Sequence, residues 1–169
     1  PRWAFEQLFA GPPEFKTMKP YIPNGLNMKH LGLFMNQTFS GRLTEDKIKA
    51  VRDKWKGNLV IKGIVNPEDA ERAIKLGVDG LIVSNHGGRQ LDSGESTIKP
   101  LTELAKKYSD SVPLMMDGGI RSGVDIASTL ASGAKFTFLG RAPMFGAWAM
   151  GAKGGDQALQ ILKRQIQQV

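Results

Sequence analysis

From residue 44 onward, short apolar runs alternate with longer stretches of helical periodicity, and no other feature of the chain limits its fold as strongly. Each apolar run has the length and composition of a strand that is buried on both faces. The runs occupy residues 58–65, 79–84, 112–117 and 135–140. The strand–helix unit repeats four times, with a helix before and after. Such alternation favours an α/β fold in which parallel strands are joined by right-handed crossover helices.

Local signals place the helices between these runs. Thr44 and Ser122 are suited to cap the starts of helices that end at Gly57 and Gly133. Asn66 is followed by a proline and two acidic residues, which together predict a helix start. The remaining signals are Gly77 as a helix end, Thr97 and Pro100 at the start of a helix over 98–108, and Asp156 as the cap of the last helix.

The regular spacing of the strand–helix units favours part of a TIM (β/α)₈ barrel over a doubly wound sheet. A complete barrel needs about 250 residues, whereas this chain has 169. Four parallel strands alone would also leave two unpaired edges. We therefore expect residues 44–169 to be an incomplete domain. It would be a piece of a larger protein, a half-barrel that pairs, or a cleaved chain held by its other part.

Residues 1–43 differ from the rest, because prolines interrupt them and Asn24-Gly25 marks a turn. We interpret this segment as an irregular, loop-rich connection packed on a core, with His30 as a structural residue. A mobile loop or a membrane-interface patch centred on residues 27–35 is the alternative. The N-terminus has no signal-peptide pattern, and no run reaches the roughly 18 apolar residues of a membrane span. We expect a cytoplasmic protein or one peripheral to a membrane.

Composition argues against several kinds of site. The chain has no cysteine, which rules out disulfides and thiolate chemistry. Its two histidines are not part of a Cys/His cluster, so we expect no metal. The net charge is +7 at pH 7, but the lysines and arginines form no block with interleaved aromatic residues, which argues against nucleic acid. An anionic cofactor or substrate, or a basic solvated surface, explains the charge.

Polar residues or glycines stand at the end of each predicted strand, where the working residues of barrels lie. Residues 84–89 (SNHGGR) follow the second strand and combine His86, paired glycines and Arg89. Histidine suits a general base near neutral pH, and arginine suits bidentate binding of a carboxylate. We predict proton transfer beside a bound carboxylate. A structural histidine in a polar loop is the alternative.

The other strand ends carry cations and glycines. Lys62 closes the first strand and either aims its charge at an electron-rich ligand or pairs with a carboxylate. Residues 117–121 (DGGIR) close the third strand, and Gly140-Arg141 closes the fourth. Glycines let backbone N–H groups approach an anion, and each turn also brings an arginine. We predict a phosphate site at these two turns, although turns of this composition are commonly only turns.

The segments SNHGGRQLD, LMMDGGIRSG and LGRA, in this order and spacing, resemble the FMN-dependent 2-hydroxy acid oxidases and dehydrogenases. The resemblance covers nearly the whole chain and corresponds to the C-terminal half of the family's barrel. It implies FMN as cofactor and oxidation of an (S)-2-hydroxy acid of the lactate, glycolate or mandelate type to a 2-oxo acid. The implied electron acceptor is oxygen, a quinone or a cytochrome, and the family precedent is a homo-oligomer.

The resemblance also implies a role for each matching residue. Lys62 would lie against the N1–C2=O edge of the flavin, and Ser84 would contact the FMN. His86 would be the base that starts the oxidation, and Arg89 would hold the substrate carboxylate. The cofactor-binding set is completed by Asp117, Gly118, Gly119, Ile120, Arg121, Gly140 and Arg141.

The family's first four strands supply further flavin and substrate contacts, and none of them is in this chain. The resemblance therefore implies little or no turnover by residues 1–169 alone. Two alternatives stay open. One is a half-barrel that binds FMN or phosphate without catalysis. The other is a different phosphate-binding barrel enzyme, against which the close spacing of His86 and Arg89 argues.

Overall fold

A computed structural model describes residues 2–10, 17–22, 32–36 and 41–169, and the chain divides into two units, Pro1–Leu43 and Thr44–Val169. The first unit contains α1 (Arg2–Ala10), η1 (Lys19–Tyr21) and a short helix at residues 32–36. The expectation of an irregular connection did not include these helices. His30 and most of the predicted interface patch lie outside the described residues. No helix in the described ranges is long and apolar enough to cross a membrane.

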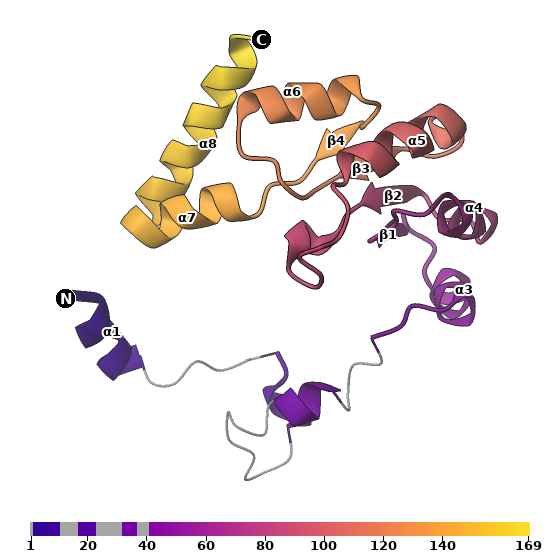
Figure 1. The fold of residues 1–169 in the computed structure, drawn as a ribbon. Helices are drawn as coiled ribbons and strands as arrows, with labels where there is room; N and C mark the ends of the chain where they lie inside the picture. Colours follow the sequence, from indigo (N-terminus) through magenta and orange to yellow (C-terminus); the bar gives the residue numbers. More distant parts are fainter. Residues whose placement is uncertain (1, 11–16, 23–31, 37–40) are drawn as a thin grey trace. The chain divides into compact units, whose positions relative to one another are not determined.

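The second unit is built on a sheet of four parallel strands, as the alternation predicts (Figure 1). The strands lie in the order β1-β2-β3-β4, so each strand pairs with its neighbours in sequence. The sheet does not close, because β1 and β4 each have a partner on one side only. Their bounds are β1 (Val60–Lys62), β2 (Gly80–Val83), β3 (Leu114–Met116) and β4 (Phe136–Thr137). The fold is thus α/β and covers part of a barrel.

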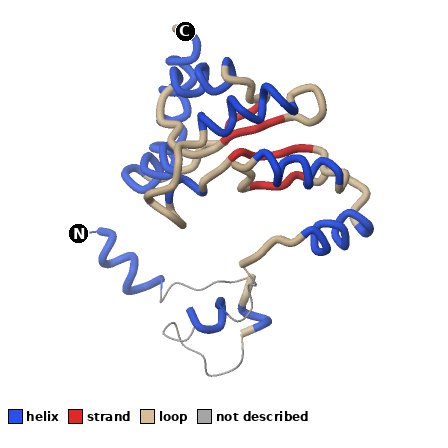
Figure 2. Tube along the Cα trace, turned by 45° about the vertical axis from the view of Figure 1, so that its right-hand side comes forward, coloured by secondary structure: helices blue, strands red, loops and turns tan. Residues whose placement is uncertain are grey.

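Figure 2 shows the strands side by side with helices of the same unit packed around them. The Asn66 side chain caps its helix by accepting the Glu68 N–H at 2.8 Å, and Ser122 forms a capping box with Asp125, as the sequence predicts. The last helix begins earlier than the predicted cap at Asp156. The helices are α3 (Glu45–Lys54), α4 (Pro67–Lys75), α5 (Ile98–Tyr108), α6 (Gly123–Ala131), α7 (Arg141–Met150) and α8 (Ala152–Gln167).

The two faces of the sheet have different environments. Ile61, Leu81 and Leu114 form one row across the strands, and each is at most 5% exposed. They belong to the core that α4, α5 and α6 complete with apolar side chains. Because side chains alternate along a strand, the next row lies on the opposite face. That row runs from Lys62 through Ile82 and Met115 to Phe136, which is 57% exposed.

Truncation of the core is expected to destabilise this unit strongly. Leu101 of α5 is fully buried, and replacing a buried leucine with alanine costs about 2–5 kcal/mol. Leu159 of α8 is 49% exposed, so Leu159→Ala is a matched control that should cost much less. Urea unfolding of Leu101→Ala and Leu159→Ala measures both values. Equal losses in the two variants would contradict the assignment of the core.

Candidate active site

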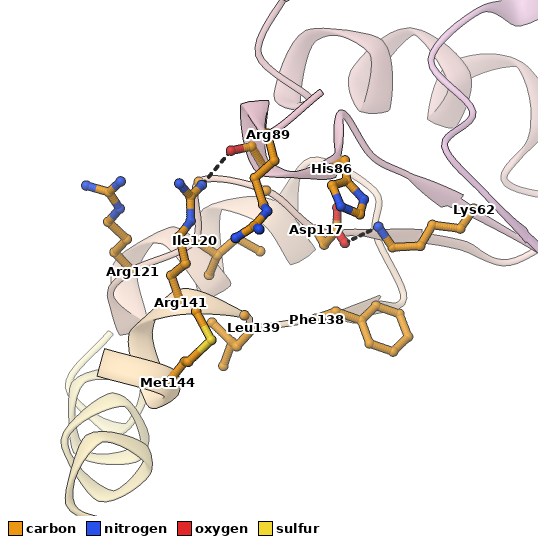
Figure 3. Close-up of a pocket in the computed structure, with 14 residues that line it drawn as sticks. Lys62, His86, Arg89, Asp117, Ile120, Arg121, Phe138, Leu139, Arg141 and Met144 are labelled. Carbon is orange, nitrogen blue, oxygen red and sulfur yellow. Dashed lines mark hydrogen bonds and ion pairs between the residues drawn. The ribbon is translucent and has the colours of Figure 1, made fainter. Parts of the chain in front are cut away.

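The ends of the strands and the loops that follow them surround a cavity of about 250 Å³ (Figure 3). All the predicted site residues except Ser84 line it. Gly87, one of the paired glycines after His86, lines it too, as do Phe138, Leu139 and Met144, which the sequence did not single out. Ser84 lines a second cavity of about 470 Å³, which also contains Lys62 and His86 in its wall. Lys62 and His86 therefore border both cavities.

Lys62, the last residue of β1, contacts the residues that follow β2 and β3. Its Nζ lies 2.7 Å from Ser84 Oγ and 2.6 Å from Asp117 Oδ2, so the cation pairs with a carboxylate, one of the two roles expected for it. The other carboxylate oxygen, Asp117 Oδ1, is buried without a hydrogen-bond partner in the described part of the chain. A buried acceptor left unpaired costs about 1–3 kcal/mol. The site therefore offers an acceptor to a donor from a bound molecule.

The turn that carries His86 has an unusual backbone. His86, Gly87 and Gly88 have consecutive positive φ angles of 57°, 66° and 73°, so η2 (His86–Gly88) is a left-handed turn. His86 is the only non-glycine residue with a positive φ among the described residues. For such a residue the left-handed conformation costs about 1–2 kcal/mol. Strain of this kind persists where surrounding contacts enforce it, and it clusters at functional sites.

Three side chains hold the turn in place. Ser84 Oγ accepts the His86 backbone N–H at 3.1 Å. Asn85 Oδ1 accepts the Gly87 N–H at 3.0 Å. Arg141, the first residue of α7, donates from Nη2 to the Gly87 carbonyl at 2.6 Å. Sequence reasoning missed Asn85, although an asparagine that accepts the N–H two residues later is a known turn signal.

The walls on the side of β3 and β4 are largely backbone. Gly119 has a φ of +76°, and a Cβ at Gly119 or Gly140 would meet no atom within 4 Å. A ligand can therefore approach the main chain at these two turns. Arg89 and Arg141 both line the cavity, while Figure 3 shows Arg121 extending away from the other labelled side chains. With Lys62 paired, the arginines leave the cavity positively charged and suited to an anion.

The start of α6 contributes less to this site than its position suggests. The Gly123 N–H is bonded to Gln165 Oε1 of α8 at 2.8 Å, and the Asp125 N–H to Ser122 Oγ at 3.1 Å. Asp125 Oδ2 accepts the N–H groups of Arg121 and Ser122. By contrast, the N-terminus of α7, at Arg141, faces the cavity and supplies a partial positive charge. The anion site therefore depends on the glycine turns, the arginines and α7.

The Asp125 cap predicts an acid-dependent loss of stability. Hydrogen bonds from the backbone N–H of Arg121 and from Ser122 hold the pKa of Asp125 below its usual value. Because the folded-state pKa is the lower one, the carboxylate stabilises the fold above about pH 4 and loses this effect as the pH falls through the folded-state pKa. Asp125→Asn should thus lower the thermal midpoint at pH 7 and converge with the wild type in acid.

Thermal unfolding between pH 2.5 and pH 7 measures this effect. Asp110→Asn, in an exposed turn, is the control and should change little across the range. A difference between Asp125→Asn and the wild type that stays constant with pH would show that the cap acts without its charge.

Comparison with known proteins identifies close relatives of the whole chain. The family model of the FMN-dependent dehydrogenases matches residues 1–169. An L-lactate dehydrogenase of Caulobacter sp. (strain K31) is 35% identical over 98% of this chain and 44% of its own length. The L-lactate dehydrogenase of Alcaligenes faecalis is 36% identical, with the same coverage. The chain thus spans less than half the length of these relatives.

Solved structures of two mandelate enzymes also resemble this chain. The crystal structure of the monotopic membrane protein (S)-mandelate dehydrogenase has a TM-score of 0.86 and 34% identity, and the match covers 98% of this chain and 43% of that one. Mandelate oxidase with (S)-4-hydroxymandelic acid has a TM-score of 0.70 and 40% identity, over 73% of this chain and 35% of that one. The match to mandelate dehydrogenase covers nearly the whole chain and therefore includes the cavity and its loops, which lie in the second unit.

Proposed function

This chain belongs to the FMN-dependent dehydrogenase family, and we propose that the whole protein oxidises a small (S)-2-hydroxy acid to a 2-oxo acid with bound FMN. The observation that carries the proposal is the composition of one cavity wall. His86 and Arg89, a base and a carboxylate clamp, border the same cavity as the glycine turns and arginines of an anion site. The lactate and mandelate enzymes among its relatives support this substrate class.

The residues present fit the family's cofactor, FMN. Its sugar chain carries hydroxyl groups, and the buried Asp117 Oδ1 is an acceptor without a donor in the described residues. Its phosphate is an anion, and Gly119 and Gly140 leave the backbone open beside the arginines. When bound, FMN supplies a two-electron acceptor. The residues that would hold it are Lys62, Ser84, Asp117, Gly118, Gly119, Ile120, Arg121, Gly140 and Arg141.

Each remaining step is assigned to a residue of this chain. Arg89 holds the substrate carboxylate in a fork of two parallel hydrogen bonds. His86 then accepts a proton from the substrate as its carbon is oxidised. Lys62, fixed between Ser84 and Asp117, would lie beside the bound cofactor, where its positive charge would stabilise negative charge. Both hydride transfer and a carbanion route are compatible with these roles.

A second candidate is a half-barrel that binds FMN or phosphate without catalysis. It is favoured by the open edges of β1 and β4 and by the coverage of only 44% of the lactate dehydrogenase relatives.

The electron acceptor is oxygen, a quinone or a cytochrome in our proposal, and the whole protein is a homo-oligomer. The monotopic mandelate dehydrogenase supports a peripheral membrane location as the alternative to the cytoplasm.

An absorbance spectrum tests both candidates. FMN is added to the 169-residue chain and to the whole protein, followed by an (S)-2-hydroxy acid in the absence of oxygen. The whole protein should bind flavin and bleach, whereas the chain alone should bind flavin and stay yellow. Bleaching by the chain alone would overturn the second candidate. A whole protein that binds FMN without bleaching in lactate, glycolate and mandelate would overturn the proposed reaction.

A further inference from the structure

One side chain that the mechanism does not use, that of Asn85, touches three segments that meet at the cavity. Its Oδ1 accepts the N–H of Gly87, directly after His86, at 3.0 Å. Its Nδ2 donates to the carbonyl of Glu95, in the loop that leads to α5, at 3.1 Å. A Cβ at Gly118 would lie only 2.8 Å from the same Oδ1. Asn85 therefore packs directly against the turn that follows β3.

The turn after β3 is fixed from a second side by Thr97. Thr97 stands at the start of α5, as predicted, but its Oγ1 does not cap the helix and instead donates to the Asp117 carbonyl at 3.0 Å, and the residue is only 2% exposed. Gly118, with a φ of +95°, is thus enclosed between Asn85 Oδ1 and Thr97 Oγ1, which would lie 3.5 Å from its Cβ. Asn85 thus contacts both the turn at His86 and the turn at Asp117.

His86 needs such a support because its own backbone is strained. Its φ of +57° is stable only where neighbouring contacts enforce it. The Asn85 side chain fixes the peptide group immediately after His86 by accepting the Gly87 N–H. Through its contact with Gly118, it also sets the position of that peptide group relative to the turn after β3. A base that moves by about 1 Å relative to the group it serves can lose about 100-fold in rate.

We propose that Asn85 is a positioning residue that sets the His86 base in register with the Asp117–Gly118 turn of the cofactor site. Its action on turnover rests on the proposed function, because it operates through His86. Its action on the geometry of the turn does not depend on the proposed function. The two parts can therefore be tested separately.

The chain provides a matched control. Asn66 Oδ1 accepts the Glu68 N–H at 2.8 Å at the start of α4, the same kind of bond between a side chain and the N–H two residues later. Asn66 lines neither of the two cavities described above. Asn85→Ala removes both hydrogen bonds of the Asn85 side chain, and Asn85→Asp keeps the acceptor but loses the donor to Glu95.

The first readout is amide hydrogen exchange of the 169-residue chain, which needs no substrate. The informative amides are those of Gly88 and Arg89, because their bonds to the Asn85 and His86 carbonyls do not involve the Asn85 side chain. Asn85→Ala should exchange these amides at least about ten-fold faster, and Asn66→Ala should change only the first turn of α4. Exchange at Gly88 and Arg89 that is unchanged in Asn85→Ala would overturn the proposal.

The second readout is turnover of the whole protein. Asn85→Ala should lower kcat about 100-fold with little change in KM, Asn66→Ala should change neither, and Asn85→Asp should recover at least a tenth of the wild-type kcat. Equal losses in Asn85→Ala and Asn85→Asp would overturn the role of Oδ1. If the wild type has no 2-hydroxy acid activity, the proposed function fails, while the exchange data still decide whether Asn85 holds the turn.

If Asn85→Ala does not fold, Asn85→Asp carries the exchange test. Its protection at Gly88 and Arg89 should stay within a few-fold of the wild type, because the acceptor for the Gly87 N–H remains, while the Glu95 loop exchanges faster. Loss of protection at Gly88 and Arg89 in Asn85→Asp would overturn the proposal.

Discussion

Asparagine in place of His86 is expected to lower kcat/KM of the whole protein for an (S)-2-hydroxy acid by about 10³–10⁴-fold, the upper range for a positioned general base. An amide cannot take up a proton near neutral pH as an imidazole does. Asparagine is the best replacement, because residue 86 has a φ of +57° and asparagine tolerates the left-handed region better than most residues. Anaerobic flavin reduction in a stopped-flow instrument measures the loss.

Controls separate loss of the base from loss of the fold or cofactor. FMN binding by His86→Asn should stay close to that of the wild type, because no predicted phosphate contact is removed. His30→Gln, at the other histidine of the chain, should retain wild-type turnover. In His86→Gly, added imidazole should restore part of the rate. A His86→Asn variant that keeps more than about a tenth of the wild-type rate would exclude His86 as the base.

The parallel sheet could be predicted because its evidence is local. Four short apolar runs, each flanked by helix caps, leave few alternatives to strands joined by crossovers. Asn66 and Ser122 cap their helices as predicted, since each cap depends only on residues two or three positions away. The half-barrel followed from the same spacing together with a length too short for a complete barrel.

The sequence predicted one last helix starting at Asp156 and missed α7 and the first turn of α8, because their arrangement depends on a contact between the two helices. α7 has apolar residues on most of its surface and a proline near its start, so it lacks an amphipathic period. A Cβ at Gly154 would lie 2.0 Å from the Gly146 carbonyl oxygen. The two helices approach backbone to backbone there, and α8 begins at Ala152, after Gly151, instead of at Asp156.

The candidate site also contains residues that could be predicted from the sequence and residues that could not. His86, Arg89 and the glycine turns were visible because strand ends gather polar residues at one edge of a parallel sheet. Asn85 was missed although its bond to the Gly87 N–H is a local turn signal, whereas its contact with Gly118 and the role of Thr97 depend on the turn after β3. Thr97 has the sequence context of a helix cap, but its hydroxyl bonds a carbonyl 20 residues away. Propensity alone cannot distinguish these two uses of a threonine hydroxyl.

The last prediction concerns the carboxylate clamp. Arg89→Met is expected to lower kcat/KM for the 2-hydroxy acid by about 1,000-fold, since two hydrogen bonds to a charged group contribute about 1.5–3 kcal/mol each. Arg89→Lys should lose less, because it keeps the charge but not the planar fork. Figure 3 shows Arg89 extending into the cavity that His86 also borders, so a carboxylate held by Arg89 would place the neighbouring carbon near the base.

Comparing a 2-hydroxy acid with its methyl ester isolates this role. The ester lacks the negative charge, so the wild type should prefer the acid strongly, and Arg89→Met should lose that preference while its rate on the ester stays within a few-fold of the wild type. Arg121→Met, at another arginine that lines the cavity, is the matched control. It should weaken FMN binding and leave the acid-to-ester ratio unchanged. An unchanged ratio in Arg89→Met would assign the substrate carboxylate to residues other than Arg89.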